Sequence, residues 1–126
     1  MSNHESPNRR PICWFEIPVK DTQNAMKFYG QLFGWTFEEF IEFEPDYWSI
    51  NTGDSSLFGG LVKTTEVINS VGVTLFVHVE NIQEVINKAI QLGGFVVAQE
   101  SVITENAGRH AKIKDLDGNT IGLWAK

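Results

Sequence analysis

Residues 108–126 read GRHAKIKDLDGNTIGLWAK, and this stretch decides how the rest of the chain is interpreted. Asp117-Gly118 at its centre favours a tight hairpin turn, because primed turns need the positive φ that this pair adopts at low cost. Apolar and polar residues alternate on both sides of the turn, as in strands with one buried face. The face expected to be buried carries Ala111, Ile113, Ile121, Leu123 and Ala125. The opposite face, expected to line a hollow, carries His110, Lys112, Lys114, Thr120, Gly122 and Trp124.

The segment upstream of this hairpin predicts a strand, a helix and another strand. Residues 73–79 alternate in the same way and are predicted to form a strand. Asn81, with Glu84 three residues later, is a capping arrangement that predicts the start of a helix. Gly93-Gly94 predicts the end of that helix. The next strand is predicted at 95–99, with a loop through 106–108 leading into the hairpin.

The N-terminal part of the chain repeats this order of elements. Residues 12–19 predict a strand, with Cys13, Phe15, Ile17 and Val19 on its apolar face. Asp21 and Gly34 predict the two ends of a helix. Three further strands are predicted at 35–40, 47–51 and 57–63, with an acidic loop (Glu42, Glu44, Pro45, Asp46) after the first of them.

The spacing of the helix ends reveals an internal repeat. Asp21 and Asn81 are 60 residues apart, and so are Gly34 and Gly94. Such self-similarity predicts two βαβββ halves, at about 11–63 and 73–126, joined by a connector at 64–72. A half of this size is marginal alone, so the halves are expected to pair and to enclose a common cleft. Together they form one domain, 11–126, preceded by a flexible tail at 1–10.

Composition excludes several classes of partner and location. A net charge of −6 argues against nucleic acid, because phosphate binding needs clustered Lys and Arg. No apolar run approaches the roughly 20 residues of a membrane span, and no secretory leader is recognisable, so no membrane partner is expected. The single cysteine, Cys13, excludes an internal disulfide and favours a cytoplasmic location.

The segments WFEIPVKDTQNAMKFYGQLFGW, VHVENIQEVINKAIQLGG and GRHAKIKDLDGNTIGLW resemble the vicinal oxygen chelate superfamily. This superfamily includes glyoxalase I, extradiol dioxygenases, fosfomycin-resistance enzymes and bleomycin-binding proteins. The chain is most similar to the branch of predicted lactoylglutathione-lyase-related proteins. The resemblance implies an α+β fold in which tandem βαβββ modules form a cup-shaped mixed sheet with helices on its outer face. It also implies a homodimer and a ligand site inside the cup.

The resemblance further implies four positions at which metal-using relatives place His, Gln or Glu. Carried onto this sequence, these positions are Trp14, Gly59, Thr74 and Gly122. None of them is a usual metal ligand, because glycine has no side chain and an indole only donates hydrogen bonds. We therefore expect no metal centre of the family type and no cofactor. Two alternatives remain open: a relocated divalent metal, or metal-free acid/base catalysis by Glu16 and His78.

The residues expected to line the cup suit a small aromatic or amphipathic organic molecule, because they combine aromatic rings with a few ionisable groups. Besides Glu16 and His78, they are Trp14, Tyr47, Ser49, Thr74, Phe76, His110, Lys112 and Trp124. Binding or sequestering such a molecule is the favoured function. A lyase, isomerase or dioxygenase relative is the second hypothesis. The third is a dimeric interaction module in which Trp14 and Trp124 fill the cup.

Overall fold

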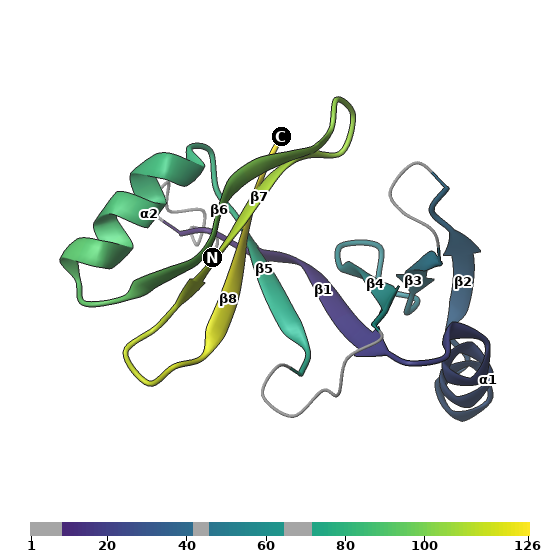
Figure 1. Cartoon of the computed structure of the whole chain (residues 1–126). Helices are drawn as coiled ribbons and strands as arrows, with labels where there is room; N and C mark the ends of the chain where they lie inside the picture. Colours follow the sequence, from purple (N-terminus) through teal and green to yellow (C-terminus); the bar gives the residue numbers. More distant parts are fainter. Residues whose placement is uncertain (1–8, 42–45, 65–71) are drawn as a thin grey trace, which may run out of the picture.

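The computed structural model describes residues 9–41, 46–64 and 72–126, and within them the order βαβββ occurs twice (Figure 1). The elements of the N-terminal half are β1 (Ile12–Val19), α1 (Thr22–Phe33), β2 (Thr36–Glu39), β3 (Tyr47–Asn51) and β4 (Phe58–Lys63). Those of the C-terminal half are β5 (Thr74–His78), α2 (Ile82–Gln91), β6 (Phe95–Thr104), β7 (Gly108–Lys114) and β8 (Thr120–Ala125). Residues 1–8 of the predicted tail, 42–45 of the predicted acidic loop and 65–71 of the predicted connector lie outside the described residues.

All eight strands belong to one mixed sheet, in the order β2-β3-β4-β1-β5-β8-β7-β6. The first strand of each half pairs in parallel with the last strand of the same half. The two halves are joined where β1 and β5 pair antiparallel. Figure 1 shows the strongly twisted sheet, with α1 beside β2 at one end and α2 beside β6 at the other. The predicted α+β fold is therefore confirmed. Neither helix is long and apolar enough to cross a membrane, as judged over the described residues.

The helix ends lie where the capping residues predict them. The Asp21 carboxylate accepts a hydrogen bond from the Asn24 backbone N–H at 2.9 Å, and Gly34 ends α1 in the left-handed region at φ 76°. The Asn81 side chain accepts from the Glu84 backbone N–H at 3.0 Å at the start of α2. These contacts satisfy amides that the first turn of a helix leaves without a partner.

The final hairpin has the predicted faces but a different turn. Lys114 and Thr120 still pair, so five residues, 115–119, form the loop, and among these only Gly118 has a positive φ, of 88°. Asp115 organises this loop. Its carboxylate accepts from the backbone N–H groups of Asp117 and Asn119, both at 2.9 Å. A two-residue primed turn at Asp117-Gly118 would require a positive φ at Asp117. Asp117 does not have one, so this prediction is wrong.

Strand β6 is also longer than predicted. It runs through Thr104 rather than ending at Gln99, and its register with β7 shifts three times. Val102, Ile103 and Thr104 are β-branched and favour an extended backbone, which accounts for the continuation. The extension brings Ile103 to the wall of the cavity described below.

Candidate ligand-binding site

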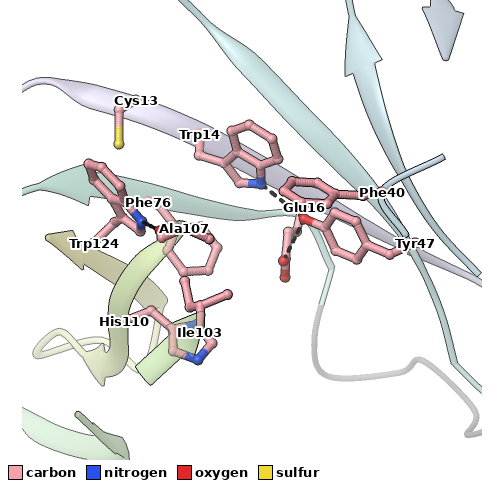
Figure 2. Close-up of a pocket in the computed structure, with 10 residues that line it drawn as sticks. All are labelled: Cys13, Trp14, Glu16, Phe40, Tyr47, Phe76, Ile103, Ala107, His110 and Trp124. Carbon is pink, nitrogen blue, oxygen red and sulfur yellow. Dashed lines mark hydrogen bonds between the residues drawn. The ribbon is translucent and has the colours of Figure 1, made fainter. Parts of the chain in front are cut away.

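A cavity of about 340 Å³ lies on the face of the sheet opposite the helices, and both halves contribute to its wall (Figure 2). Pockets for small molecules usually span roughly 300–1,000 Å³. The N-terminal half supplies Cys13, Trp14, Glu16, Phe40 and Tyr47. The C-terminal half supplies Phe76, Ile103, Ala107, His110 and Trp124. Trp14 and Trp124 thus form part of the wall and leave this volume open.

A chain of hydrogen bonds connects three residues of the N-terminal wall. The Trp14 indole Nε1 donates to the Tyr47 hydroxyl at 3.0 Å, and that hydroxyl donates to Glu16 Oε2 at 2.9 Å (Figure 2). Tyr47 is only 2% exposed. Its ring crosses β4 at Gly60, where an added Cβ would lie 2.0 Å from the Tyr47 hydroxyl oxygen. Glycine at this position therefore allows the contact between Tyr47 and Glu16.

The C-terminal wall is held by a second set of close contacts. The Trp124 indole Nε1 donates to the Ala107 carbonyl at 2.7 Å. The Phe76 ring lies across Gly122, where an added Cβ would be 2.3 Å from Phe76 Cδ2. At positions 60 and 122, glycines therefore leave the space that the two aromatic rings occupy. They let those rings lie flat on the sheet.

Two ionisable groups of the wall are kept uncharged near neutral pH. Burial lowers the pKa of His110, and the positive charge of Lys112 lowers it further. Burial raises the pKa of the Cys13 thiol. Among the residues that the structure describes, Glu16 is the acidic side chain of this wall, and Figure 2 shows its carboxyl group turned toward the hollow.

Six of the predicted site residues meet at the cavity: Trp14, Glu16, Tyr47, Phe76, His110 and Trp124. Four others do not form part of its wall. Ser49 donates its hydroxyl to the Glu38 carbonyl at 3.1 Å, and Thr74 is buried against the sheet at 4% exposure. Lys112 acts on His110 through its charge but is not part of the wall.

His78, the fourth, lies far from Glu16. Glu16 pairs with Thr74 across the β1–β5 ladder, whereas the His78 backbone N–H donates to the Pro11 carbonyl at its other end. Four residues of strand separate the two positions, which is about 13 Å at the usual rise. The His78 ring instead packs on Trp124, with ring centroids 5.2 Å apart. The predicted acid/base pair of Glu16 and His78 is therefore not formed, and His110 is the histidine that shares the cavity with Glu16.

One of the four positions carried over for a metal needs correction. Gly60, and not Gly59, is the residue of β4 that pairs with Glu16 and faces the cavity. A Cβ on Gly59 would lie 2.5 Å from the Phe15 ring, on the side of α1. A register error of one residue exchanges the two faces of a strand. Because both residues are glycines, the corrected position offers no ligand either.

The side chains at these positions do not fit a divalent metal. Such a site needs three or more N, O or S donors converging on one ion. Trp14 uses its N–H on Tyr47, Gly60 and Gly122 have no side chain, and Thr74 has a single hydroxyl. Within residues 9–41, 46–64 and 72–126, no group of three His, Cys, Asp or Glu side chains is placed to hold a metal ion.

Four wall residues were not predicted from the sequence: Cys13, Phe40, Ile103 and Ala107. Cys13 was expected on the helix side. A register shift between Ile12 and Trp14 breaks the alternation of β1, so that two consecutive residues reach the cavity. Ile103 and Ala107 belong to the extension of β6 and the turn after it. The run of β-branched residues at 102–104 was the available signal for that extension.

Comparisons with known proteins agree with this architecture. A family model described as bleomycin resistance protein-like N-terminal matches residues 12–53. A glyoxylase-like domain-containing protein of Didymella fabae is 26% identical over 119 residues, covering 91% of this chain and 93% of that protein.

Solved structures share the fold at lower identity. A glyoxalase/bleomycin resistance protein/dioxygenase superfamily member from Vibrio splendidus superimposes with a TM-score of 0.64. It is 13% identical, over 94% of this chain and all of that chain (100%). Methylmalonyl-CoA epimerase from Mycobacterium tuberculosis superimposes with a TM-score of 0.66 and is 17% identical, over 90% of this chain and 86% of that one. At these identities the likeness concerns the fold alone.

Proposed function

We propose that the chain is a member of the vicinal oxygen chelate superfamily of glyoxalase, bleomycin-resistance and dioxygenase proteins, and that it binds a small organic molecule between its two halves. The molecule is aromatic or amphipathic, and binding or sequestering it is the function. The metal centre of the superfamily takes no part, because the residues at its four positions do not supply a ligand set.

The cavity is the observation that supports this proposal. Five aromatic rings surround it, from Trp14, Phe40, Tyr47, Phe76 and Trp124. Burying a ligand against such rings contributes roughly 25 cal/mol for each Å² of apolar surface removed from water. Four of these rings are held by the hydrogen bonds and glycine contacts described above, and Phe40 packs edge-on against Tyr47 with ring centroids 6.0 Å apart. Little side-chain ordering therefore remains to be done on binding.

The experiment that tests the proposal is a calorimetric titration of 2-naphthylmethanol into protein dialysed against a chelator. We expect binding with a stoichiometry of one, at least about tenfold weaker in Ile103→Trp, where the indole fills the cavity. Val102→Trp is the matched control, because Val102 is 57% exposed and is not part of the wall. Absence of binding to the wild-type protein, or equal binding to Ile103→Trp, contradicts the proposal.

A second candidate function is metal-free acid/base catalysis. The observation that favours it is that Glu16 and His110 share one cavity, and an uncharged imidazole is able to accept a proton near neutral pH. His110 then accepts a proton from the bound molecule, and Glu16 is the second group available for proton transfer. Turnover of a bound compound, lost in both Glu16→Gln and His110→Gln while binding persists, would favour this function over sequestration.

A further inference from the structure

We propose that the ligand of this cavity is an aromatic acid whose carboxylate is bound by His110, with Lys112 beside it. The inference deepens the proposed function and rests on it, since it names the chemical class of the molecule bound at the same site. It follows from the hydrogen-bonding capacity of His110, from the lysines that share its face of the sheet and from the positions of these groups along the cavity.

The His110 ring lines the cavity without a hydrogen-bond partner among the described residues. Every buried side-chain nitrogen or oxygen in this part of the chain has such a partner, so the His110 ring nitrogens must be accessible from the cavity or from solvent. By contrast, the Trp14 and Trp124 indoles each use their single N–H on an oxygen atom of the protein. A neutral imidazole carries one N–H donor, which leaves His110 able to donate to an oxygen of the ligand.

Positive charge gathers on the same face of the sheet as His110. Lys112 and Lys114 follow His110 at two-residue steps along β7, so all three side chains leave the strand on one face. The Lys112 charge reaches the His110 ring, because it lowers the pKa of that ring. In the part of the chain that the structure describes, neither lysine forms an ion pair, whereas Arg109 on the opposite face of β7 is paired with Glu100.

The strands on either side of β7 add no negative charge here. Cross-strand partners share a face of the sheet, and the partners of these three residues are Trp124, Ser101, Gly122, Ala98, Thr120 and Phe95. All six are uncharged. A locally positive surface on a chain whose net charge is −6 runs against the overall composition, and it favours an anionic ligand.

The carboxyl group of the wall lies further along the sheet than His110. His110, Trp124 and His78 form one row across β7, β8 and β5. Glu16 pairs with Thr74, four residues before His78, so about 13 Å of strand separate its row from that of His110. Figure 2 shows the His110 and Glu16 side chains on different sides of the hollow. A carboxylate at His110 is therefore bound away from Glu16, and the aromatic body of the ligand occupies the space between them.

A carboxylate is the head group that uses both His110 and Lys112. Hydrogen bonds to an ionised acceptor are roughly twice as strong as those between neutral groups. Removing a carboxylate from water costs free energy, which the His110 N–H and the Lys112 charge together offset. A neutral alcohol gains only the hydrogen bond, and an ammonium group is repelled by Lys112.

Three probes with one ring system separate the charge of the head group from the aromatic body. They are the anionic 2-naphthoate, the neutral 2-naphthylmethanol and 2-naphthylmethylamine, which is cationic at pH 7. In calorimetric titrations at pH 7, we expect the acid to bind at least about tenfold more tightly than the alcohol, and the amine to bind most weakly. The preference for the acid should shrink when salt is raised, because screening weakens charge pairs near solvent.

Lys112→Gln is the decisive variant, because it removes the charge without altering a residue of the wall. The ratio of acid affinity to alcohol affinity should fall by at least about fivefold. His110→Phe keeps a ring but removes the N–H donor, and it should lower the same ratio by at least about threefold. Lys88→Gln removes the same unit of charge at an exposed position of α2 and should leave the ratio within about twofold. Circular dichroism confirms that each variant is folded.

The outcomes distinguish this inference from the function beneath it. If the alcohol binds and the acid binds no more tightly, the acid inference is wrong and the binding function stands. The same conclusion follows if Lys112→Gln and Lys88→Gln change the ratio equally, or if His110→Phe keeps it. If folded wild-type protein binds none of the three probes at millimolar concentration, the binding function fails, and the acid inference fails with it.

Discussion

The two halves of the molecule share their order of elements but differ in how their helices are covered. In the C-terminal half, Ile82 and Ile86 of α2 are each 1% exposed and pack into a core with Ala111 and Leu123. In the N-terminal half, Thr22 is the buried residue of α1, while Phe28 and Phe33 are 59% and 57% exposed.

At the cavity, the N-terminal half, whose helix is less well covered, contributes most of the polar groups. The N-terminal half supplies the hydrogen-bonded chain that ends on Glu16, whereas the C-terminal wall is mostly apolar apart from His110. The two halves of the repeated fold therefore differ in what they contribute. The C-terminal half contains the better-packed core, and the N-terminal half supplies the hydrogen-bonded residues of the cavity wall.

The largest effect should come from removing equivalent helix residues in the two halves. Ile86→Ala, in the core of the C-terminal half, should lower the free energy of unfolding by about 2–5 kcal/mol. Met26, 60 residues earlier in α1, is only partly buried, so Met26→Ala should cost under about 1.5 kcal/mol. Urea denaturation monitored by circular dichroism measures both. Equal losses would show that the two helices are packed alike.

Substitution of Gly60 tests whether the contact between Tyr47 and Glu16 in the N-terminal wall depends on glycine at this position. In Gly60→Ala the new methyl group displaces the Tyr47 ring and breaks its bond to Glu16, at a cost of about 1–3 kcal/mol in unfolding free energy. Affinity for 2-naphthylmethanol should fall with it, because the displaced ring enters the cavity. Gly72→Ala is the control, because its added Cβ meets nothing within 4 Å, and its effect should stay within about 0.5 kcal/mol. A stable Gly60→Ala with unchanged affinity would show that the Tyr47 contact is dispensable.

Each half also has a carboxylate held by hydrogen bonds, and acid should weaken both. Hydrogen bonds from Thr22 and Trp48 lower the pKa of Asp46, and bonds from Asn119 and its neighbours lower the pKa of Asp115. A pKa lower in the folded than in the unfolded state stabilises the fold above the ordinary value, near 3.8, and this stabilisation is lost as pH falls. The deficit in unfolding free energy of Asp46→Asn and of Asp115→Asn relative to wild type should therefore be smaller below about pH 4 than at pH 7. Urea midpoints between pH 7 and pH 3 measure it, and a constant deficit would contradict the assignment.

The smallest effect on stability should come from a substitution on the exposed face of α1. Such a substitution should instead change how the protein self-associates. We propose that a second copy of the chain covers this face. Phe28 occupies the position that Lys88 occupies in α2, 60 residues later, which suits contact with protein rather than water. Phe28→Lys should leave the unfolding free energy of dilute protein within about 0.5 kcal/mol and convert a dimer into a monomer in sedimentation equilibrium. A wild-type protein that is monomeric, or a variant that remains dimeric, would contradict the proposal.

Sequence patterns predicted the structure correctly where the two faces of a strand differ chemically, and where a helix begins at a capping residue. Alternation correctly placed Ala111 and Leu123 in the core and His110 and Trp124 on the open face. Capping residues correctly located both helices, because Asp21 and Asn81 offer an acceptor to the first turn.

The remaining features depend on how strands pair, which alternation does not specify. His78 and Glu16 share a face, but the antiparallel pairing of β1 with β5 separates them along the ladder. The register shift that brings Cys13 to the cavity and the one-residue difference between Gly59 and Gly60 also arise from pairing. The hydrogen bond between Tyr47 and Glu16 joins strands that are not neighbours in the sequence, so no local sequence pattern predicts it.

The most direct test of a shared, metal-independent site is an NMR titration of chelator-treated, isotope-labelled protein with 2-naphthylmethanol. We expect saturable shifts of the Trp14 indole N–H in the N-terminal half and of the Ile103 and Ala107 methyl groups in the C-terminal half, all with one dissociation constant. Shifts confined to one half, shifts on the outer face of the sheet, or binding that appears only after divalent metal is added would contradict the account.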